Sequence, residues 1–235
     1  MHDPDPAVAP HRHIRSFVRR EGRLTPAQQQ ALITLLPSYG LPAQPQATLD
    51  FTEVFGNVNP LLLEIGYGNG ASLLAQAIAN PQQNHIGLEV HRPGAGHLLQ
   101  EIDRQQLINV RIAITDAAAW LPVAVASDSV QTVQVFFPDP WHKKRHHKRR
   151  LIQTAFVDEL ARILAPGGTL MLATDWQNYA EHMLAVMTAH ACFSNCAGDG
   201  SYHTRPACRP LTRFERRGQR LGHQVFDLQF QRRAD

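Results

Sequence analysis

The sequence predicts an α/β fold in which a mostly parallel β-sheet carries helices on both faces. From residue 60 onward, apolar strand-like segments alternate with helix-like segments of about 10 to 16 residues. This alternation is typical of strand–helix–strand units, which build parallel sheets. The first strand-like segment, LLLEIG at residues 61–66, runs straight into a glycine-rich turn and a helix, as the first unit of such a sheet does.

Start and stop signals place the individual elements. Thr25 followed by Pro26 begins a helix within residues 25–40, since the first residue can cap the helix and the second fits its first turn. Further helices are expected at residues 71–80, which Pro81 ends, at 94–107, at 150–165, which Pro-Gly-Gly ends, and at 176–190. Strands are expected at residues 61–66, 85–90, 109–115, 130–137, 169–174 and 223–231.

We expect one domain preceded by an arm. Residues 1–24 form a flexible basic arm that either orders on a partner or stays solvated. Residues 25–235 form the single domain, with a helical lead-in at 25–59 and the sheet-containing core at 60–235.

The charge of the chain is concentrated in one place. The 235 residues are 43% hydrophobic and 18% charged, which is typical of a globular protein, and the net charge is +3. Residues 142–150, HKKRHHKRR, hold six of the 23 Lys and Arg residues, so the rest of the chain is net acidic. Such local basicity indicates a site for a polyanion.

The remaining composition argues for a cytoplasmic protein without metal or membrane partners. Cys192, Cys196 and Cys208 form no CxxC pair, which favours a reducing compartment and excludes a zinc-type spacing. The N-terminus lacks an apolar signal segment, and the longest apolar stretch, around residues 61–79, is interrupted by Glu64 and three glycines.

The turn EIGYGNGAS at residues 64–72 suits a nucleoside ligand. Gly66, Gly68 and Gly70 allow a tight turn and a close approach of the ligand to the backbone. The same glycines also fit a loose dinucleotide fingerprint. Glu64 favours a different ligand, because its carboxylate would repel a pyrophosphate and attract the sulfonium and ammonium groups of S-adenosylmethionine.

Two further acids end the next strands. Glu89 is placed to accept hydrogen bonds from ribose hydroxyls, and Asp116 could bind an adenine amino group. Together with Glu64 they predict a rim of acids for a cationic nucleoside, and the alternative is three solvated loop acids.

The fourth strand ends in FPDPW at residues 137–141. Two prolines restrict the backbone around Asp139 and hold its carboxylate at the strand end. Asp139 is therefore the catalytic candidate, although it could simply cap the following segment. Trp141 either stacks on a base or packs inside the protein.

Five segments carry a family resemblance: EIGYGNG, GLEVHRPG, FPDPWHKKRHHKRRL, ATDWQNYAEHM and RPLTRFERRGQRLGH. Together they resemble the bacterial tRNA (guanine-N7)-methyltransferase family from about residue 13 nearly to the C-terminus. The FPDPW block with its basic continuation and the TRFERRG block are specific, whereas the glycine loop is generic.

The resemblance implies a Rossmann-like class I methyltransferase fold with a mostly parallel seven-stranded sheet. It implies methyl transfer from S-adenosylmethionine to N7 of guanosine 46 in the variable loop of tRNA. The implied cofactor contacts are Glu64, Gly66, Gly68, Gly70, Glu89, Asp116 and Asp139. The implied substrate contacts are Lys143, Asp175, Thr212, Arg213, Phe214 and Glu215, and the implied RNA-facing segment is Arg145, His146, His147, Lys148, Arg149 and Arg150.

Two of these regions also have interpretations from their residues alone. Asp175 could bind the guanine or cap the helix that follows it. The arginines of residues 209–223 indicate a second basic patch beside the pocket, or else a solvated structural loop. They are Arg209, Arg213, Arg216, Arg217 and Arg220.

Other functions remain open at this stage. A nicotinamide-dependent oxidoreductase fits the glycines but not Glu64. A module that binds RNA without methyl transfer would not need a full set of acids. The same chemistry could act on a different RNA or DNA base nitrogen, or on a protein side chain. The chain could work as a monomer or a homodimer.

Overall fold

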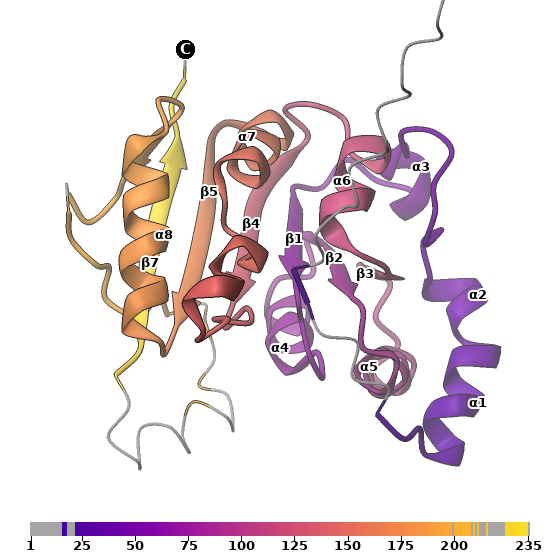
Figure 1. The fold of residues 1–235 in the computed structure, drawn as a ribbon. Helices are drawn as coiled ribbons and strands as arrows, with labels where there is room; N and C mark the ends of the chain where they lie inside the picture. The colour runs from indigo at the N-terminus through magenta and orange to yellow at the C-terminus, as the bar shows by residue number, and fades with distance from the viewer. Residues whose placement is uncertain are drawn as a thin grey trace, which may run out of the picture.

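A computed structural model describes residues 16–17, 22–198, 200–207, 209, 211, 215 and 224–234. Within these residues seven strands form one sheet in the order β3-β2-β1-β4-β5-β7-β6 (Figure 1). The strands are β1 Leu61–Ile65, β2 Asn84–Glu89, β3 Val110–Ile114, β4 Val130–Phe136, β5 Leu164–Thr174, β6 Phe193–Asn195 and β7 Phe226–Arg232. The predicted α/β fold class with a mostly parallel seven-stranded sheet is confirmed.

The parallel part of the sheet brings the predicted site residues to one edge. Strands β1 to β5 pair in parallel, and Leu63 of β1 lies in register with Ile86 of β2 and Val133 of β4. The carboxyl ends of these strands therefore meet along one edge, at the bottom of the view in Figure 1. The chain order reverses between β1 and β4, and ligands of open α/β sheets bind at such a point.

Helices cover both faces of the sheet (Figure 1). Buried residues of α6, α7 and α8 pack on one face, and those of α1, α4 and α5 pack on the other. The helices are α1 Pro26–Thr34, α2 Leu36–Tyr39, α3 Phe51–Phe55, α4 Ala71–Ala79, α5 Arg92–Arg104, α6 Ala117–Ala124, α7 Thr154–Ile163 and α8 Gln177–Ala189, with a 3₁₀ helix η1 Lys144–Arg149.

Several elements differ from those predicted. The expected helix at residues 25–40 is divided into α1 and α2, with Leu35 as the cap between them. Strand β5 begins at Leu164 rather than at residue 169, since the Pro-Gly-Gly turn lies inside an irregular pairing with β4. Helix α3 lies inside the predicted helical lead-in but was given no bounds of its own, and α6 and β6 were not predicted, because these elements are short and α6 contains Pro122.

The part of the chain that the structure describes contains no helix with both the length and the apolar character needed to cross a membrane. Residues 1–15 and 18–21 of the predicted basic arm lie outside the described residues.

Candidate active site

A cleft of about 900 Å³ opens at the carboxyl edge of the sheet, beside the ends of β2 and β3. We call it the strand-end cleft. Its walls include Phe17, Leu24, Val90, His91, Ile114, Asp116 and Trp120. Asp116 also caps α6, since its Oδ1 accepts a hydrogen bond from the Ala118 N–H at 3.1 Å. The structure thus places one predicted acid in the cleft, and the loop after Glu89 forms another part of its wall.

The glycine loop is held against the second strand. Gly66, Gly68 and Gly70 all have positive φ angles, of 77°, 60° and 80°, which favour glycine over other residues. The Gly68 N–H donates to Glu89 Oε2 at 2.8 Å. A Cβ atom on Gly94 of α5 would lie 1.9 Å from the Gly68 carbonyl oxygen, so the helix and the loop can pack this closely only with glycine at position 94.

Glu89 acts as an anchor for this loop. Its Oε1 accepts hydrogen bonds from the N–H groups of Val90 at 2.7 Å and His91 at 2.9 Å, while Oε2 accepts from Gly68. A carboxylate offers about four acceptor positions, so one position remains for a further donor. Its predicted bonds to ribose hydroxyls stay a prediction.

Glu64 is buried at the end of β1, with 3% of its surface exposed. Its Oε2 has no hydrogen-bond partner among the described residues. Burial raises the pKa of Glu64 to about 8, an effect that the Glu89 charge increases and a hydrogen bond with Ser72 partly offsets. A buried carboxyl group with one oxygen left without a partner in this way fits a ligand that brings a positive charge to it.

Tyr67 lies in the same loop, and the sequence interpretation missed it. Its ring packs where a Cβ on Gly87 would lie, and its buried hydroxyl has no partner among the described residues. Burial, followed by the charges of Glu89 and Glu64, raises the pKa of the Tyr67 hydroxyl. A tyrosine between two glycines of a ligand loop could have drawn attention to it. Glu64, Tyr67 and Glu89 together fit the cationic nucleoside expected here, S-adenosylmethionine.

The turn after β4 carries Asp139 at the surface. Phe137 and Trp141, on either side of Pro138-Asp139-Pro140, have positive φ angles of 52° and 48°. Such angles are strained for bulky residues. The Phe137 N–H donates to the Ala173 carbonyl at 2.8 Å, which ties the turn to the end of β5. Asp175 follows that strand end directly, so the two candidate acids come from adjacent strand ends.

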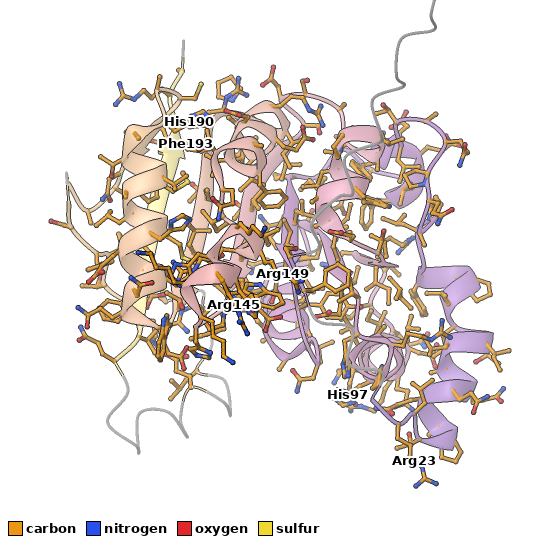
Figure 2. All side chains as sticks on the ribbon, viewed as in Figure 1. Arg23, His97, Arg145, Arg149, His190 and Phe193 are labelled. Atoms are coloured by element: carbon orange, nitrogen blue, oxygen red, sulfur yellow. The ribbon has the colours of Figure 1, made fainter. Side chains whose placement is uncertain are left out.

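The basic segment, residues 142–150, follows this turn. Lys143, Lys144, Arg145, Lys148 and Arg149 are exposed. In Figure 2, His190 and Phe193 lie near the top of the view, and Arg145 and Arg149 lie below them, near its middle. The segment therefore presents its cations at the carboxyl edge of the sheet, beside Asp139.

Trp141 packs against neighbouring groups. The Arg149 guanidinium lies 5.0 Å from the centre of the Trp141 ring. The indole N–H donates to the Ser16 carbonyl at 2.9 Å, so this tryptophan joins the described part of the arm to the turn. These contacts favour the packing interpretation over base stacking.

Arg150 differs from the other cations of the basic segment. It is 3% exposed, and its guanidinium bonds to Pro140 and Asn178. The structure therefore does not place Arg150 on the exposed surface where an RNA-facing residue was expected. The sequence could not separate it from Arg149, because the two are adjacent and chemically identical.

Arg209 is also buried, so the prediction that it belongs to an exposed basic patch is wrong. Its guanidinium is paired with Glu215, at 2.6 and 3.0 Å, and with Asp227 of β7, at 2.7 and 2.9 Å. Glu215 is buried in this ion pair, and its role as a substrate contact stays a prediction. The other predicted residues of this region, Thr212, Arg213, Phe214, Arg216, Arg217 and Arg220, lie outside the described residues.

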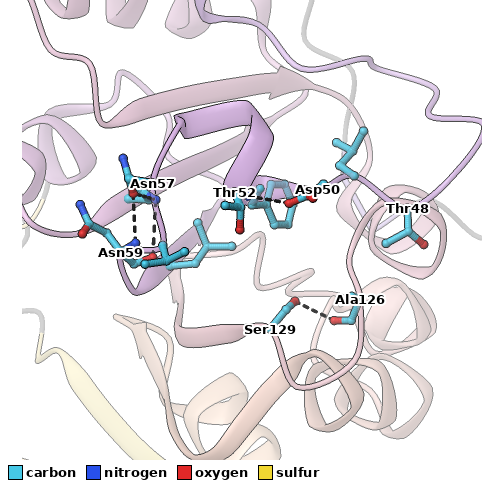
Figure 3. Close-up of a pocket in the computed structure, with 12 residues that line it drawn as sticks. Thr48, Asp50, Thr52, Asn57, Asn59, Ala126 and Ser129 are labelled. Carbon is cyan, nitrogen blue, oxygen red and sulfur yellow. Dashed lines mark hydrogen bonds between the residues drawn. The ribbon is translucent and has the colours of Figure 1, made fainter.

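A second hollow, of about 480 Å³, lies near the amino ends of the strands (Figure 3). Its polar groups are largely engaged with one another. Asp50 caps α3 through the Thr52 N–H, and the Asn84 amide donates to Asn57 Oδ1 at 2.8 Å. None of the predicted site residues lines it, so the strand-end cleft is the candidate active site. Among the residues with described positions, no cluster of three or more His, Cys, Asp or Glu side chains could hold a metal ion.

Known proteins resemble this chain over nearly its whole length. A family model described as "Putative methyltransferase" matches residues 58–228. The tRNA (guanine-N(7)-)-methyltransferase of Alcanivorax borkumensis is 53% identical over 234 residues, 99% of this chain and 98% of that protein. The chain belongs to the tRNA (guanine-N7)-methyltransferase family. The protein of the same description from Sodalis glossinidius is 54% identical over 219 residues, covering 93% of this chain and 91% of the relative.

Solved structures support the fold of this family member. The 16S rRNA methyltransferase KamB matches with a TM-score of 0.60 and 16% identity, over 80% of this chain and 96% of that one. The aminoglycoside resistance methyltransferase NpmB1 matches with a TM-score of 0.53 and 18% identity, over 80% and 94%. The predicted family and the predicted class I methyltransferase fold are both confirmed.

Proposed function

We propose that this protein transfers a methyl group from S-adenosylmethionine to N7 of a guanosine in tRNA, at position 46 of the variable loop. The observation that carries the proposal is that a buried acid and a set of exposed cations lie at the same edge of the sheet. The buried carboxyl of Glu64, with one oxygen lacking a partner among the described residues, accounts for a cationic cofactor, and the exposed cations of the basic segment account for a polyanionic substrate. The 53% identity to a tRNA (guanine-N(7)-)-methyltransferase supports the assignment of the acceptor.

Asp116 in the strand-end cleft, together with Glu64, Glu89 and the glycine loop, would hold the cofactor. Glu64 would face its positive charge, Glu89 its ribose and Asp116 its adenine, while the glycine loop lets it approach the backbone. When bound, S-adenosylmethionine supplies an activated methyl group, whose transfer leaves S-adenosylhomocysteine and a positively charged guanine ring.

Methylation of guanine N7 requires little proton transfer by the protein. Guanine N7 has an in-plane lone pair, so no proton must leave before it attacks the methyl carbon. Positioning should therefore supply much of the rate enhancement. Asp139 and Asp175 would stabilise the positive charge that develops on the guanine ring. They could also accept hydrogen bonds from the guanine N1–H and amino group, which adenine cannot offer in the same pattern.

The basic segment would bind the RNA backbone. Its exposed lysines and arginines neutralise phosphates and release counterions, so affinity for tRNA should fall as salt rises. A guanosine stacked inside folded RNA has to be turned outward to reach a cofactor in a cleft.

The test is to incubate the protein with unmodified tRNA and labelled S-adenosylmethionine. Borohydride reduction followed by aniline cleaves RNA at N7-methylguanosine. We expect one cleavage site, in the variable loop, that depends on both protein and cofactor. Label incorporated without cleavage there would contradict the proposed acceptor atom or position, and no incorporation at all would contradict the methyl transfer.

A further inference from the structure

Arg150 connects the turn after β4 to the start of helix α8. Its Nε donates to the Pro140 carbonyl at 3.0 Å, Nη2 donates to Asn178 Oδ1 at 2.7 Å, and Nη1 donates to the Asn178 carbonyl at 3.3 Å. Pro140 directly follows Asp139 in the turn after β4. Asn178 lies in the first turn of α8, three residues after Asp175. One guanidinium therefore joins the backbone next to one candidate acid to the helix that begins beside the other.

The environment of Arg150 is unusual for a charged side chain. It is 3% exposed, and its guanidinium lies 4.8 Å from the centre of the Tyr179 ring. Within the described parts of the chain, the acceptors recorded for its hydrogen bonds are neutral: two carbonyls, an amide oxygen and a His147 ring nitrogen. Burying a cation without an acid partner costs free energy unless other contacts compensate, so this guanidinium depends on its contacts with Pro140, Asn178 and Tyr179.

The turn that Arg150 contacts has a strained backbone, which surrounding contacts must hold in place. Phe137 and Trp141 both hold positive φ angles. Strained backbone of this kind persists only where surrounding contacts determine it, and it is concentrated at functional sites. The Phe137 N–H is held from one side by Ala173 of β5, and Arg150 holds the Pro140 carbonyl on the other side of Asp139.

We propose that Arg150 is a positioning residue that fixes the Asp139 turn relative to Asp175, rather than a contact for RNA phosphate. This inference deepens the proposed function and rests on it. Asp139 and Asp175 must face one guanine ring to stabilise its charge, and small displacements of positioned groups are costly to rate. The last residue of the basic segment would thereby join the RNA-binding surface to the reacting acids.

The experiment compares two arginines of the basic segment, one buried and one exposed. Arg150→Gln should lower kcat about 10- to 100-fold, leaving the KM for tRNA and its salt dependence as in the unsubstituted protein. Arg145→Gln should instead raise the KM for tRNA and reduce the slope of log KM against log salt by about 0.7 to 0.9. Arg104→Gln, on α5 and 63% exposed at its side chain, serves as a control that should change neither.

A second variant tests the hydrogen bond between Arg150 and Asn178 by changing Asn178. Asn178→Ala removes the Oδ1 acceptor and should fold, since Asn178 is at the surface. We expect a smaller fall in kcat, and the double variant should be no slower than Arg150→Gln alone, because both changes remove one contact. Multiplicative losses would overturn the proposal.

Hydrogen exchange gives a readout independent of methyl transfer. In Arg150→Gln without cofactor or RNA, the amides of residues 136, 137, 139, 141 and 142 should exchange faster, while those of β1 and β2 keep their rates; Pro138 and Pro140 have no amide hydrogen. An unchanged exchange rate at the turn would overturn the proposal. The proposal would also be overturned if Arg150→Gln, like Arg145→Gln, raised the KM for tRNA and reduced its salt dependence. Should the unsubstituted protein fail to methylate tRNA, the proposed function fails, and the exchange rates still decide whether Arg150 holds the turn.

Discussion

At the scale of single residues, Glu64 is a predicted cofactor contact whose carboxyl group is buried. Its pKa is raised to about 8 by burial, so at pH 7 most of its carboxyl groups hold a proton. A cation bound beside the carboxyl lowers this pKa. We predict that binding of S-adenosylmethionine at pH 7 releases a proton, with an upper limit of about one per site. Binding calorimetry in two buffers of different ionisation enthalpy measures the number.

The matched control is Glu64→Gln, which should bind more weakly and release no proton from this site. The raised pKa of Glu64 also makes the stability of the folded protein depend on pH. Between about pH 4.5 and 8 the folded protein holds a proton that the unfolded chain has lost, so this group reduces stability as pH rises. The variant should gain stability relative to the parent protein across that window. Equal proton release by both proteins would contradict the assignment of Glu64.

Asp139 is exposed on its turn, so its substitution should affect the reaction more than the fold. We predict that Asp139→Ala lowers kcat by about 10²- to 10³-fold, the range seen when one stabilising group is removed from a transition state. The unfolding midpoint should shift little. Single-turnover methylation of tRNA and thermal unfolding measure the two effects. Unchanged turnover would remove the catalytic role.

At the scale of elements, the basic segment joins two local structures. Residues 144–149 form the 3₁₀ helix η1, which follows a turn with strained Phe137 and Trp141. The sequence located the turn and the basic segment, because prolines and charge runs are local signals, but it did not predict η1. It could not tell which side chains of the segment face solvent, since that depends on how the basic segment packs against the start of α8, through Arg150 and His142.

We predict that neutralising Lys143, Lys144 and Arg145 together raises the KM for tRNA and flattens its salt dependence. Each phosphate contact contributes about 0.7 to 0.9 to the slope of log affinity against log salt, so the slope should fall by about two to three. Cofactor affinity should stay nearly constant, because these residues belong to the exposed basic segment and not to the glycine loop, the strand-end acids or the walls of the strand-end cleft. A titration with tRNA at several salt concentrations measures the slope, and equal losses of both affinities would contradict the assignment.

Helix α6 shows where element prediction failed. Its sequence AAAWLPVA contains Pro122, which argues against a helix when read locally. The helix nevertheless forms, with Asp116 as its cap and Trp120 buried and bonded from Nε1 to the Pro42 carbonyl at 2.8 Å. Packing against the sheet and the lead-in overrode the local signal.

At the scale of the whole molecule, Arg209 joins regions that are distant in sequence. It pairs with Asp227 of β7 and with Glu215, and its guanidinium lies 5.8 and 5.5 Å from the ring centres of Phe136 and Phe137. The C-terminal strand is thereby connected to the end of β4, where the Asp139 turn begins.

We predict that Arg209→Met destabilises the protein by about 3 to 5 kcal/mol, because it leaves two buried carboxylates without their cation. Urea unfolding measures the change. Arg104→Ala removes an exposed ion pair with Glu101, and it should leave the unfolding midpoint unchanged within error. If both variants unfold at the same urea concentration, the buried network is not a stabilising element.

The sequence by itself determined the alternation of strands and helices, the glycine loop, the acids at the strand ends and the location of the basic segment. These features follow from residue periodicity, turn chemistry and charge order, which act over a few neighbouring residues. Only the tertiary structure decided that Glu64 has an unpaired oxygen, that Arg150 is buried while Arg149 is exposed, and that Arg209 pairs with Glu215 and Asp227. Burial and pairing depend on which distant elements pack together, and identical side chains therefore acquire different roles at adjacent positions.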